Sequence, residues 1–110
     1  MIFDRYQVVV VPYPFHERPI TKRRPALVLS GRRFNEENDQ TWVAMITTAK
    51  ETSWPSDIVI KDLETAGLKH PCVLRFRFQT LPNPIFVRAI GHLAGLDRLA
   101  CERQLANMLL

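Results

Sequence analysis

The stretch Lys22-Arg23-Arg24-Pro25-Ala26-Leu27-Val28-Leu29-Ser30 places three consecutive cations directly before a short apolar run. Proline has a fixed φ and no backbone N–H, so Pro25 suits the first residue of a strand and biases Arg24 towards extended backbone. The apolar run, ended by Ser30-Gly31, predicts a buried strand over 25–29. A basic loop in solvent is the ordinary interpretation of a charge run. Here the strand that follows predicts an arginine held stiffly at its start.

The chain has the length of a single domain and a net positive charge. It contains 110 residues, 46% of them hydrophobic, so we expect one domain over residues 1–110. Fifteen Lys and Arg against eleven Asp and Glu give a net charge of +4, which favours a polyanionic partner without proving one. Between residues 16 and 33 one anion, Glu17, accompanies six cations: Arg18, Lys22, Arg23, Arg24, Arg32 and Arg33.

Cysteine and hydropathy patterns argue against several protein classes. Cys72 and Cys101 lie far apart and form no C-x-x-C spacing, so we expect neither a zinc site nor a disulfide framework. His16, His70 and His92 give no metal-ligand spacing either. No signal-peptide pattern opens the chain, and no apolar run approaches the roughly 20 residues that span a bilayer. We expect a soluble cytoplasmic protein with no metal and no cofactor.

Proline and apolar patterns predict the first half of a sheet. Val8–Val11 is β-branched throughout, which favours a central strand. Pro12–Phe15 is expected to end that strand, because prolines at alternate positions cannot both donate to a ladder. A loop over 16–24 would then precede the strand at 25–29, and the polar residues 31–40 predict an exposed connection.

The second half is predicted to contain four strands. Residues 41–46 form the first, which ends at the two hydroxyls of Thr47 and Thr48, and a turn over 54–57 precedes a short strand at 58–60. Residues 73–78 alternate apolar side chains with arginine, which predicts one buried and one cationic face. The buried face would hold Leu74, Phe76 and Phe78, and the cationic face Arg75 and Arg77. Residues 86–91 predict the last strand.

Helical patterns occur in two places. Asp62 is expected to cap a helical turn that Gly67 ends. Residues 96–110 predict the only long helix, with Asp97 favourably placed in its first turn. This helix carries two apolar stripes, which indicates deep burial or a partner subunit. The stripes are Leu96, Leu99, Ala100 and Ala106, and Cys101, Leu105, Met108 and Leu109.

Short strands followed by one terminal helix predict a mainly β fold, in which a strongly bent antiparallel sheet forms a partly closed barrel. Three strand motifs then occur in a fixed order: VVVVPYPF at 8–15, RPALVLS at 24–30 and AMITT at 44–48. Weaker motifs follow at 54–57, 66–68, 73–75 and 91–93. Together they resemble the MazF/PemK toxins of bacterial toxin–antitoxin modules over almost the whole chain.

The resemblance implies a small SH3-like barrel of the CcdB/PemK type, a homodimer, and a metal-independent, sequence-specific endoribonuclease neutralised by a cognate antitoxin. It assigns the catalytic pair to Arg24, before the proline of the second strand, and Thr47, at the end of the third. Family members often carry a glutamate five residues before that arginine, where this chain has Pro19. Glu17 lies nearby but out of register, and His16 is the other candidate acid or base.

Cleavage of RNA without metal suits these residue types. The 2′-hydroxyl is an internal nucleophile, so the protein supplies alignment and stabilises charge on the phosphoryl oxygens. An arginine fork binds two such oxygens, and the Thr47 hydroxyl can donate to the same phosphate. The resemblance implies a 2′,3′-cyclic phosphate and a 5′-hydroxyl as products. Thr48 competes with Thr47, because a shift of one residue reverses which of them faces the site.

Cations and an aromatic residue are the candidates for binding single-stranded RNA. The cations can neutralise backbone phosphates, which gives salt-sensitive affinity without sequence preference. They are Lys22, Arg23, Arg32, Arg33, Arg75 and Arg77. Trp54, in a Ser-Trp-Pro-Ser turn, is the best candidate for stacking on an unpaired base.

Two other functions are considered. The first is a non-enzymatic gyrase poison resembling the CcdB toxins, which the two-striped terminal helix favours weakly, although that family's terminal tryptophan-containing signature is absent. The second is an RNA-binding barrel without catalysis. Assays of gyrase supercoiling and of RNA binding without product separate these from the ribonuclease.

Overall fold

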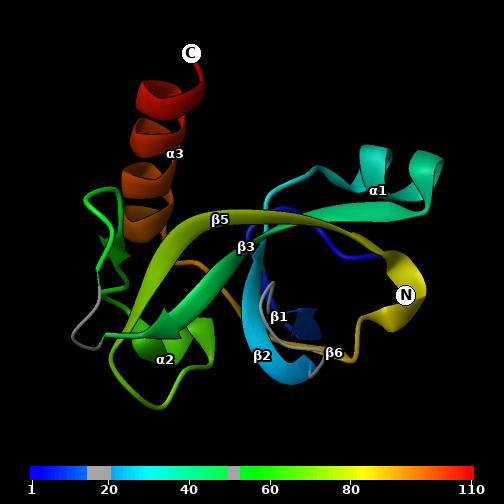
Figure 1. Ribbon diagram of the computed structural model, residues 1–110, viewed down its shortest axis with the longest axis horizontal. Coiled ribbons are helices and arrows are strands. Elements are labelled where there is room, and N and C mark those ends of the chain that lie inside the picture. The colour runs from blue at the N-terminus through cyan, green and yellow to red at the C-terminus, as the bar shows by residue number, and fades with distance from the viewer. Residues whose placement is uncertain (15–20, 50–52) are drawn as a thin grey trace.

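A computed structural model describes residues 1–14, 21–49 and 53–110 (Figure 1). The strands are β1 (Gln7–Pro14), β2 (Thr21–Val28), β3 (Gln40–Thr48), β4 (Ile58–Val59), β5 (Cys72–Pro82) and β6 (Arg88–His92). The helices are α1 (Arg32–Asn38), α2 (Leu63–Ala66), the 3-10 turn η1 (Asn83–Ile85) and α3 (Gly95–Leu109).

The strands form one curled antiparallel sheet in the order β4-β5-β3-β2-β1-β6. The long strands β3 and β5 bend over β1 and β2, and α3 stands at one end of the sheet (Figure 1). Among the described residues β4 and β6 are the two edges of the sheet, so strand pairing there does not close the barrel. The predicted fold, a mainly β SH3-like barrel with a C-terminal helix, is confirmed. Within the described residues, no helix is long and apolar enough to cross a membrane.

The sheet has a buried cluster on each face, and the valine run of β1 contributes to both. Val8 packs with Leu27, Ala44 and Ile46 in a cluster that also holds Cys101 of α3. Val9 and Val11 pack on the other face in a second cluster, which contains Ala26, Val28, Val43 and Met45. Because side chains alternate between faces, a strand buried on both sides is an uninterrupted apolar run. This explains why Val8–Val11 and 26–28 lack polar residues.

The prediction that prolines end the first strand is wrong. β1 continues to Pro14, and β2 begins at Thr21, so the predicted loop over 16–24 is partly strand. Pairing of β1 with β6 covers only Gln7–Val10, so Pro12 and Pro14 interrupt no ladder on that side. Pairing of β2 with β3 likewise starts only at Ala26, one residue after Pro25. In the part of the chain that the structure describes, each of these prolines lies where pairing with one neighbouring strand has ended, and such positions tolerate proline.

The connection over 31–40 is largely exposed as predicted, but it contains a helix, α1, that the sequence did not predict. Its polar sequence has no apolar stripe because the helix docks through a buried amide. Asn35 is fully buried; its Nδ2 donates to Phe3 O at 2.9 Å, and its backbone oxygen accepts from Asn83 Nδ2 at 2.8 Å. Asn83 Oδ1 in turn accepts from the hydroxyl of buried Thr41 at 2.7 Å. Periodicity of hydrophobic residues carries no signal for this docking.

The short helix α2 follows the predicted capping pattern. Asp62 accepts from Thr65 N at 3.0 Å, and Gly67 ends the helix with φ of 73°. The helix lies directly on β6, because a Cβ at Gly91 would meet Thr65 O at 2.5 Å. The predicted short strand before it and the last strand are confirmed as β4 and β6. The last strand starts two residues later than expected.

The terminal helix is confirmed as α3, and its two apolar stripes are at most partly buried, since Met108 and Leu109 of the second stripe are exposed. Cys101 is fully buried and Leu105 packs against the core, whereas Leu96 and Leu99 are exposed. Asp97 is only 3% exposed. Its carboxylate accepts hydrogen bonds from Lys61 N at 3.1 and 3.2 Å and from Asp62 N at 3.0 Å. Asp97 therefore ties α3 to the segment that precedes α2.

We expect Asp97→Ala to lower the free energy of unfolding by about 2–4 kcal/mol, because two backbone N–H groups lose a charged acceptor. Urea denaturation at neutral pH measures this loss. Asp62→Ala is the matched control: this exposed carboxylate caps only α2, and its loss is expected to cost about 1 kcal/mol. Equal losses for the two variants would contradict the assigned role of Asp97.

Candidate active site

Strand register places Arg24 and Thr47 on the same face of the sheet. The last pair between β2 and β3 is Ala26 with Met45, and both belong to the cluster on the Val9 and Val11 face. Arg24 and Thr47 each lie two residues beyond that pair along their strands. Their side chains therefore project from the same face of the sheet, at equal distances from the last pair. Pairing of Arg24 with Val11 in β1 agrees with this placement. Beyond the last pair, β2 and β3 diverge (Figure 1), so the two residues lie on either side of an unpaired end of the sheet.

Register also separates the two threonines. Thr48 lies two residues after Ile46 in β3, so the two side chains are on the same face. Ile46 belongs to the cluster with Val8 and Leu27, on the face opposite Arg24. Thr47 pairs with Val73 of β5 and is half-buried, whereas Thr48 is exposed. Thr47 therefore shares a face with Arg24, and Thr48 does not.

Arg24 is held at this place by its backbone. It lies in β2 with its partner strand β1 on one side, and Pro25 follows it immediately. The side chain is half-buried, and its Nε atom is fully buried. A guanidinium in such a position loses fewer conformations on binding a phosphate than one on a mobile loop. The prediction that Pro25 opens the strand and that Arg24 lies at its start is wrong, because β2 begins at Thr21 and Arg24 lies within it.

The arginines of β5 lie on the same face. Arg75 pairs with Met45, and a bulge between Ala44 and Met45 leaves Phe76 and Arg77 as extra residues in β5. Phe78 lies three residues after Arg75 and pairs with Ala44, the neighbour of Met45, so side chains still alternate between the faces across the bulge. Phe76 and Phe78 therefore lie on the face opposite Arg75, and their ring centroids are 5.6 Å apart. The predicted buried face is confirmed for Leu74 and Phe76 but is wrong for Phe78, which is 40% exposed because the cluster on this face ends before it.

Arg75 is engaged by Asp57, a residue that sequence reasoning missed. Its Nε donates to Asp57 Oδ1 at 3.1 Å and its Nη2 to Oδ2 at 2.8 Å, and both side chains are nearly buried. These hydrogen bonds hold the pKa of Asp57 below its ordinary value and raise the pKa of Arg75. The sequence predicted the turn at 54–57 that contains Asp57. Nothing in the neighbouring residues indicated that this aspartate binds a residue eighteen positions away.

The predicted turn at 54–57 is confirmed, and it lies against Arg75. Asp57 N donates to Trp54 O at 3.0 Å, and Trp54 N donates to Asp57 Oδ2 at 2.9 Å. The Arg75 guanidinium lies over the indole of Trp54, 5.4 Å from the ring centroid. Trp54 is nevertheless 42% exposed. Asp57 therefore orients both the tryptophan and the arginine.

The other predicted cations do not form one patch. Lys22 and Arg23 are exposed on β2 beside Arg24, and Lys22 shares its face. Arg32 and Arg33 lie on α1, which follows the other end of β2 (Figure 1). Arg32 forms ion pairs with Asp4 and Glu36, and Arg33 pairs with Glu37. The structure thus divides the basic window of the sequence between two ends of the sheet.

The candidate acid–base residues His16 and Glu17, and Pro19, lie outside the described residues. Within residues 1–14, 21–49 and 53–110, no three His, Cys, Asp or Glu side chains gather as a metal site would require. Both cysteines are buried there, and burial raises the pKa of the Cys101 thiol to about 12.

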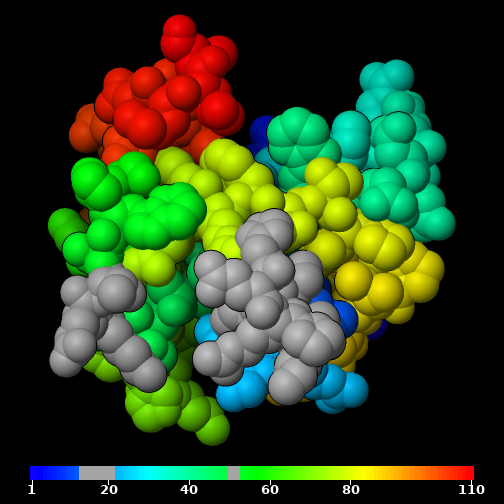
Figure 2. All heavy atoms as spheres, viewed as in Figure 1, coloured from blue at the N-terminus to red at the C-terminus, as the bar shows by residue number. Residues whose placement is uncertain are grey.

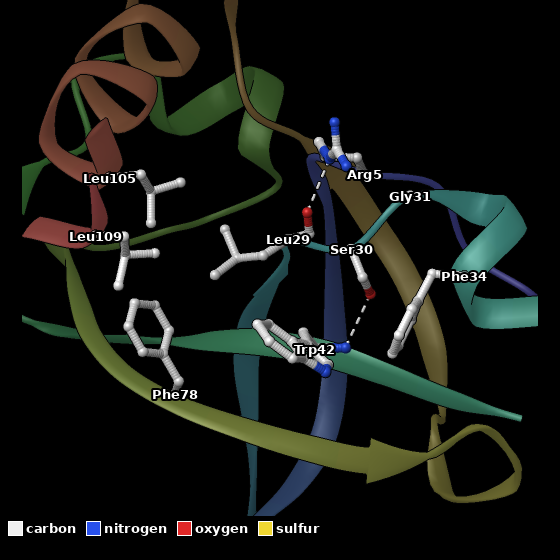
Figure 3. A pocket seen from close by; sticks show the side chains of 9 residues that line it. All are labelled: Arg5, Leu29, Ser30, Gly31, Phe34, Trp42, Phe78, Leu105 and Leu109. Carbon is white, nitrogen blue, oxygen red and sulfur yellow. Dashed lines mark hydrogen bonds between the residues drawn. The ribbon is translucent and has the colours of Figure 1, made fainter. Parts of the chain in front are cut away.

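An apolar groove of about 400 Å³ lies on the opposite face, between α3 and the sheet (Figure 3). Leu105 and Leu109 of α3 face Phe78, Trp42 and Leu29 across it. Two hydrogen bonds fix its polar rim: Arg5 Nε donates to Leu29 O at 2.8 Å, and Trp42 N donates to Ser30 Oγ at 2.9 Å. Sequence reasoning did not find this groove, since its residues come from five separate segments.

Comparison with known proteins bears on both the fold and the family. A family model described as "PemK-like, MazF-like toxin of type II toxin-antitoxin system" matches residues 4–109. No curated protein sequence matches the chain.

Solved structures share the fold at low sequence identity. The Mycobacterium tuberculosis toxin MazF-mt6 is 22% identical, with a TM-score of 0.73 over 92% of this chain and 93% of that one. A mycobacterial endoribonuclease in complex with its cognate antitoxin is 16% identical, with a TM-score of 0.74 over 98% and 93%. MazE–MazF from Deinococcus radiodurans, in its form III, is 16% identical, with a TM-score of 0.77 over 99% and 97%.

The family match spans nearly the whole chain and includes all three strand motifs. This chain is therefore a member of the PemK-like, MazF-like toxin family of type II toxin–antitoxin systems.

Proposed function

We propose that this toxin is a sequence-specific endoribonuclease that cuts single-stranded RNA without a metal ion and leaves a 2′,3′-cyclic phosphate and a 5′-hydroxyl. The observation that carries the proposal is the placement of Arg24 and Thr47 on one face at the unpaired end of β2 and β3. Family membership supports it, as does the name endoribonuclease given to a protein of the same fold.

The proposed roles follow from the chemistry of each side chain. The 2′-hydroxyl attacks the adjacent phosphorus, and the 5′-oxygen leaves, so negative charge grows on the phosphoryl oxygens. Arg24 binds two of these oxygens through its planar fork, and Thr47 donates a hydrogen bond to the same group. Lys22 and Arg77 contact backbone phosphates and give salt-dependent affinity. Arg23, Thr48, Arg32 and Arg33 are left out of the site because they lie on the other face or at the other end of β2.

The test is incubation of the purified protein with a long single-stranded RNA in excess EDTA, followed by mapping of the cut ends. We expect cleavage at a short recurring sequence, with cyclic phosphate and 5′-hydroxyl termini. Saturable binding without any product would leave only an RNA-binding barrel, and a requirement for added metal would contradict the mechanism.

We further propose a cognate antitoxin, a homodimeric toxin and a cytoplasmic location. Solved relatives of the same fold include MazE–MazF complexes. Two uncovered apolar surfaces support a second subunit: the apolar groove of Figure 3, and the exposed residues Leu96 and Leu99 on another side of α3. Sedimentation equilibrium should give twice the mass of the 110-residue chain at micromolar concentration, and a monomer there would contradict the dimer.

A further inference from the structure

The turn at 54–57 is held in place from two sides. On one side Asp57 receives the two hydrogen bonds from Arg75 of β5. On the other side Gln104 Nε2 of α3 donates to Ser56 O at 3.2 Å. Figure 2 shows the green surface of this turn beside the yellow-green surface of β5 and below the red end of α3. A surface turn fixed to a strand and to a helix is preorganised for binding.

A groove of about 360 Å³ lies between this turn and α3, lined by Trp54, Pro55, Ser56, Gln104 and Met108. Trp54 and Met108 are both substantially exposed, so the groove offers an indole and a flexible thioether. Gln104 and Ser56 line the same groove, to which Gln104 brings a side-chain amide. An aromatic plane with a few polar groups at its edge is how proteins hold unpaired bases. The volume lies at the small end of ligand pockets and suits a single heterocycle.

The position of the groove relative to the proposed site points to RNA. Val73 is the β5 partner of Thr47, and Arg75 lies two residues further along the same strand and face. Val73 and Arg75 are about 7 Å apart along β5. A nucleotide next to the scissile phosphate can therefore reach the turn, and the cations of this face match its charged backbone.

We propose that this groove is a base subsite, in which one unpaired base of the RNA substrate stacks on Trp54 and meets Gln104 at its edge. Asp57 and Arg75 are positioning residues that hold Trp54. This inference rests on the proposed ribonuclease function, since it names a subsite for the same substrate. It also changes the role of Arg75, whose Nε and Nη2 bind Asp57 rather than a phosphate.

Fluorescence of Trp54 measures binding apart from cleavage. In a Trp42→Phe background Trp54 is the only tryptophan, and a 2′-O-methyl oligonucleotide of the mapped target sequence cannot be cut. We expect saturable quenching by this oligonucleotide. With fluorescently labelled oligonucleotide, Trp54→Leu should weaken binding about 5- to 150-fold, the range for loss of one stacked base, whereas Trp54→Phe should retain most of it. Circular dichroism verifies that each variant is folded.

Salt dependence separates positioning from phosphate contact. Arg75→Gln and Asp57→Asn should both weaken binding, while the slope of log Kd against log salt concentration stays unchanged. A phosphate contact by Arg75 would instead reduce that slope by about 0.7, and this result would overturn the positioning role. Lys22→Gln is the matched comparison, because Lys22 is an exposed proposed phosphate contact on the face of Arg24 and should reduce the slope.

The outcomes distinguish the subsite from the function on which it rests. Unchanged binding and unchanged cut sites in Trp54→Leu, with active wild-type protein, overturn the subsite and leave the ribonuclease intact. Quenching by RNA without cleavage by the wild-type protein supports the subsite and contradicts the ribonuclease. Quenching by a second copy of the chain or by an acidic peptide, but not by RNA, assigns the groove to a protein partner and overturns the subsite.

Discussion

Replacing Arg24 by alanine is expected to lower the rate of RNA cleavage by about 10²–10³-fold, because the transition state loses its preorganised charged donor. The structure gives the residue unusual restraint: it is half-buried in β2, paired with Val11, and followed by a proline. Single-turnover cleavage of an end-labelled RNA measures the effect. RNA affinity should change much less than the rate, since the interaction strengthens as charge develops on the phosphoryl oxygens.

Arg24→Lys is the matched variant for this result. Lysine keeps the charge but cannot present two parallel N–H donors, so we expect it to restore little of the rate. Thermal unfolding of both variants should remain cooperative, which excludes loss of the fold as the cause. Persistent cleavage by folded Arg24→Ala would remove this residue from the mechanism.

The second large effect is expected at Thr47 and should be absent at its neighbour. Thr47→Val keeps the β-branched shape but removes the hydroxyl, and we expect cleavage to slow by about 10²-fold. Thr48→Val makes the same chemical change on the opposite face, and we expect a rate close to that of the wild type. Thr47→Ser, which retains a hydroxyl, should recover most of the activity. The same cleavage assay applies to all three variants.

The comparison of the two threonines tests the strand register directly. Their assignment depends only on the pairing of Ala26 with Met45 and of Thr47 with Val73. A large loss in Thr48→Val with normal activity in Thr47→Val would contradict the assignment. Equal losses in both would indicate an effect on the end of β3 rather than on the reaction.

Much of the strand framework was predictable because its signals are local. The valine run 8–11 and the alternation of apolar residues with arginine at 73–78 predict which strand faces are buried. Each pattern lies within the sequence of one strand. The capping pair of Asp62 and Gly67 was predictable for the same reason. Prediction failed at α1, where burial of Asn35 depends on Phe3 and Asn83, both distant in the chain. It failed also at Pro12 and Pro14, whose tolerance depends on where the neighbouring strand stops.

The sequence alone determined the order of the strands and terminal helix, and the family resemblance. These depend on residue type and short-range spacing, which act before any long-range contact forms. Only the tertiary structure decided that Thr47 rather than Thr48 joins Arg24, and that Arg75 binds Asp57 and supports Trp54. The physical reason is that register and side-chain pairing are set between segments. The sequence of one strand does not show which other strand will pair with it, or at which residue that pairing ends.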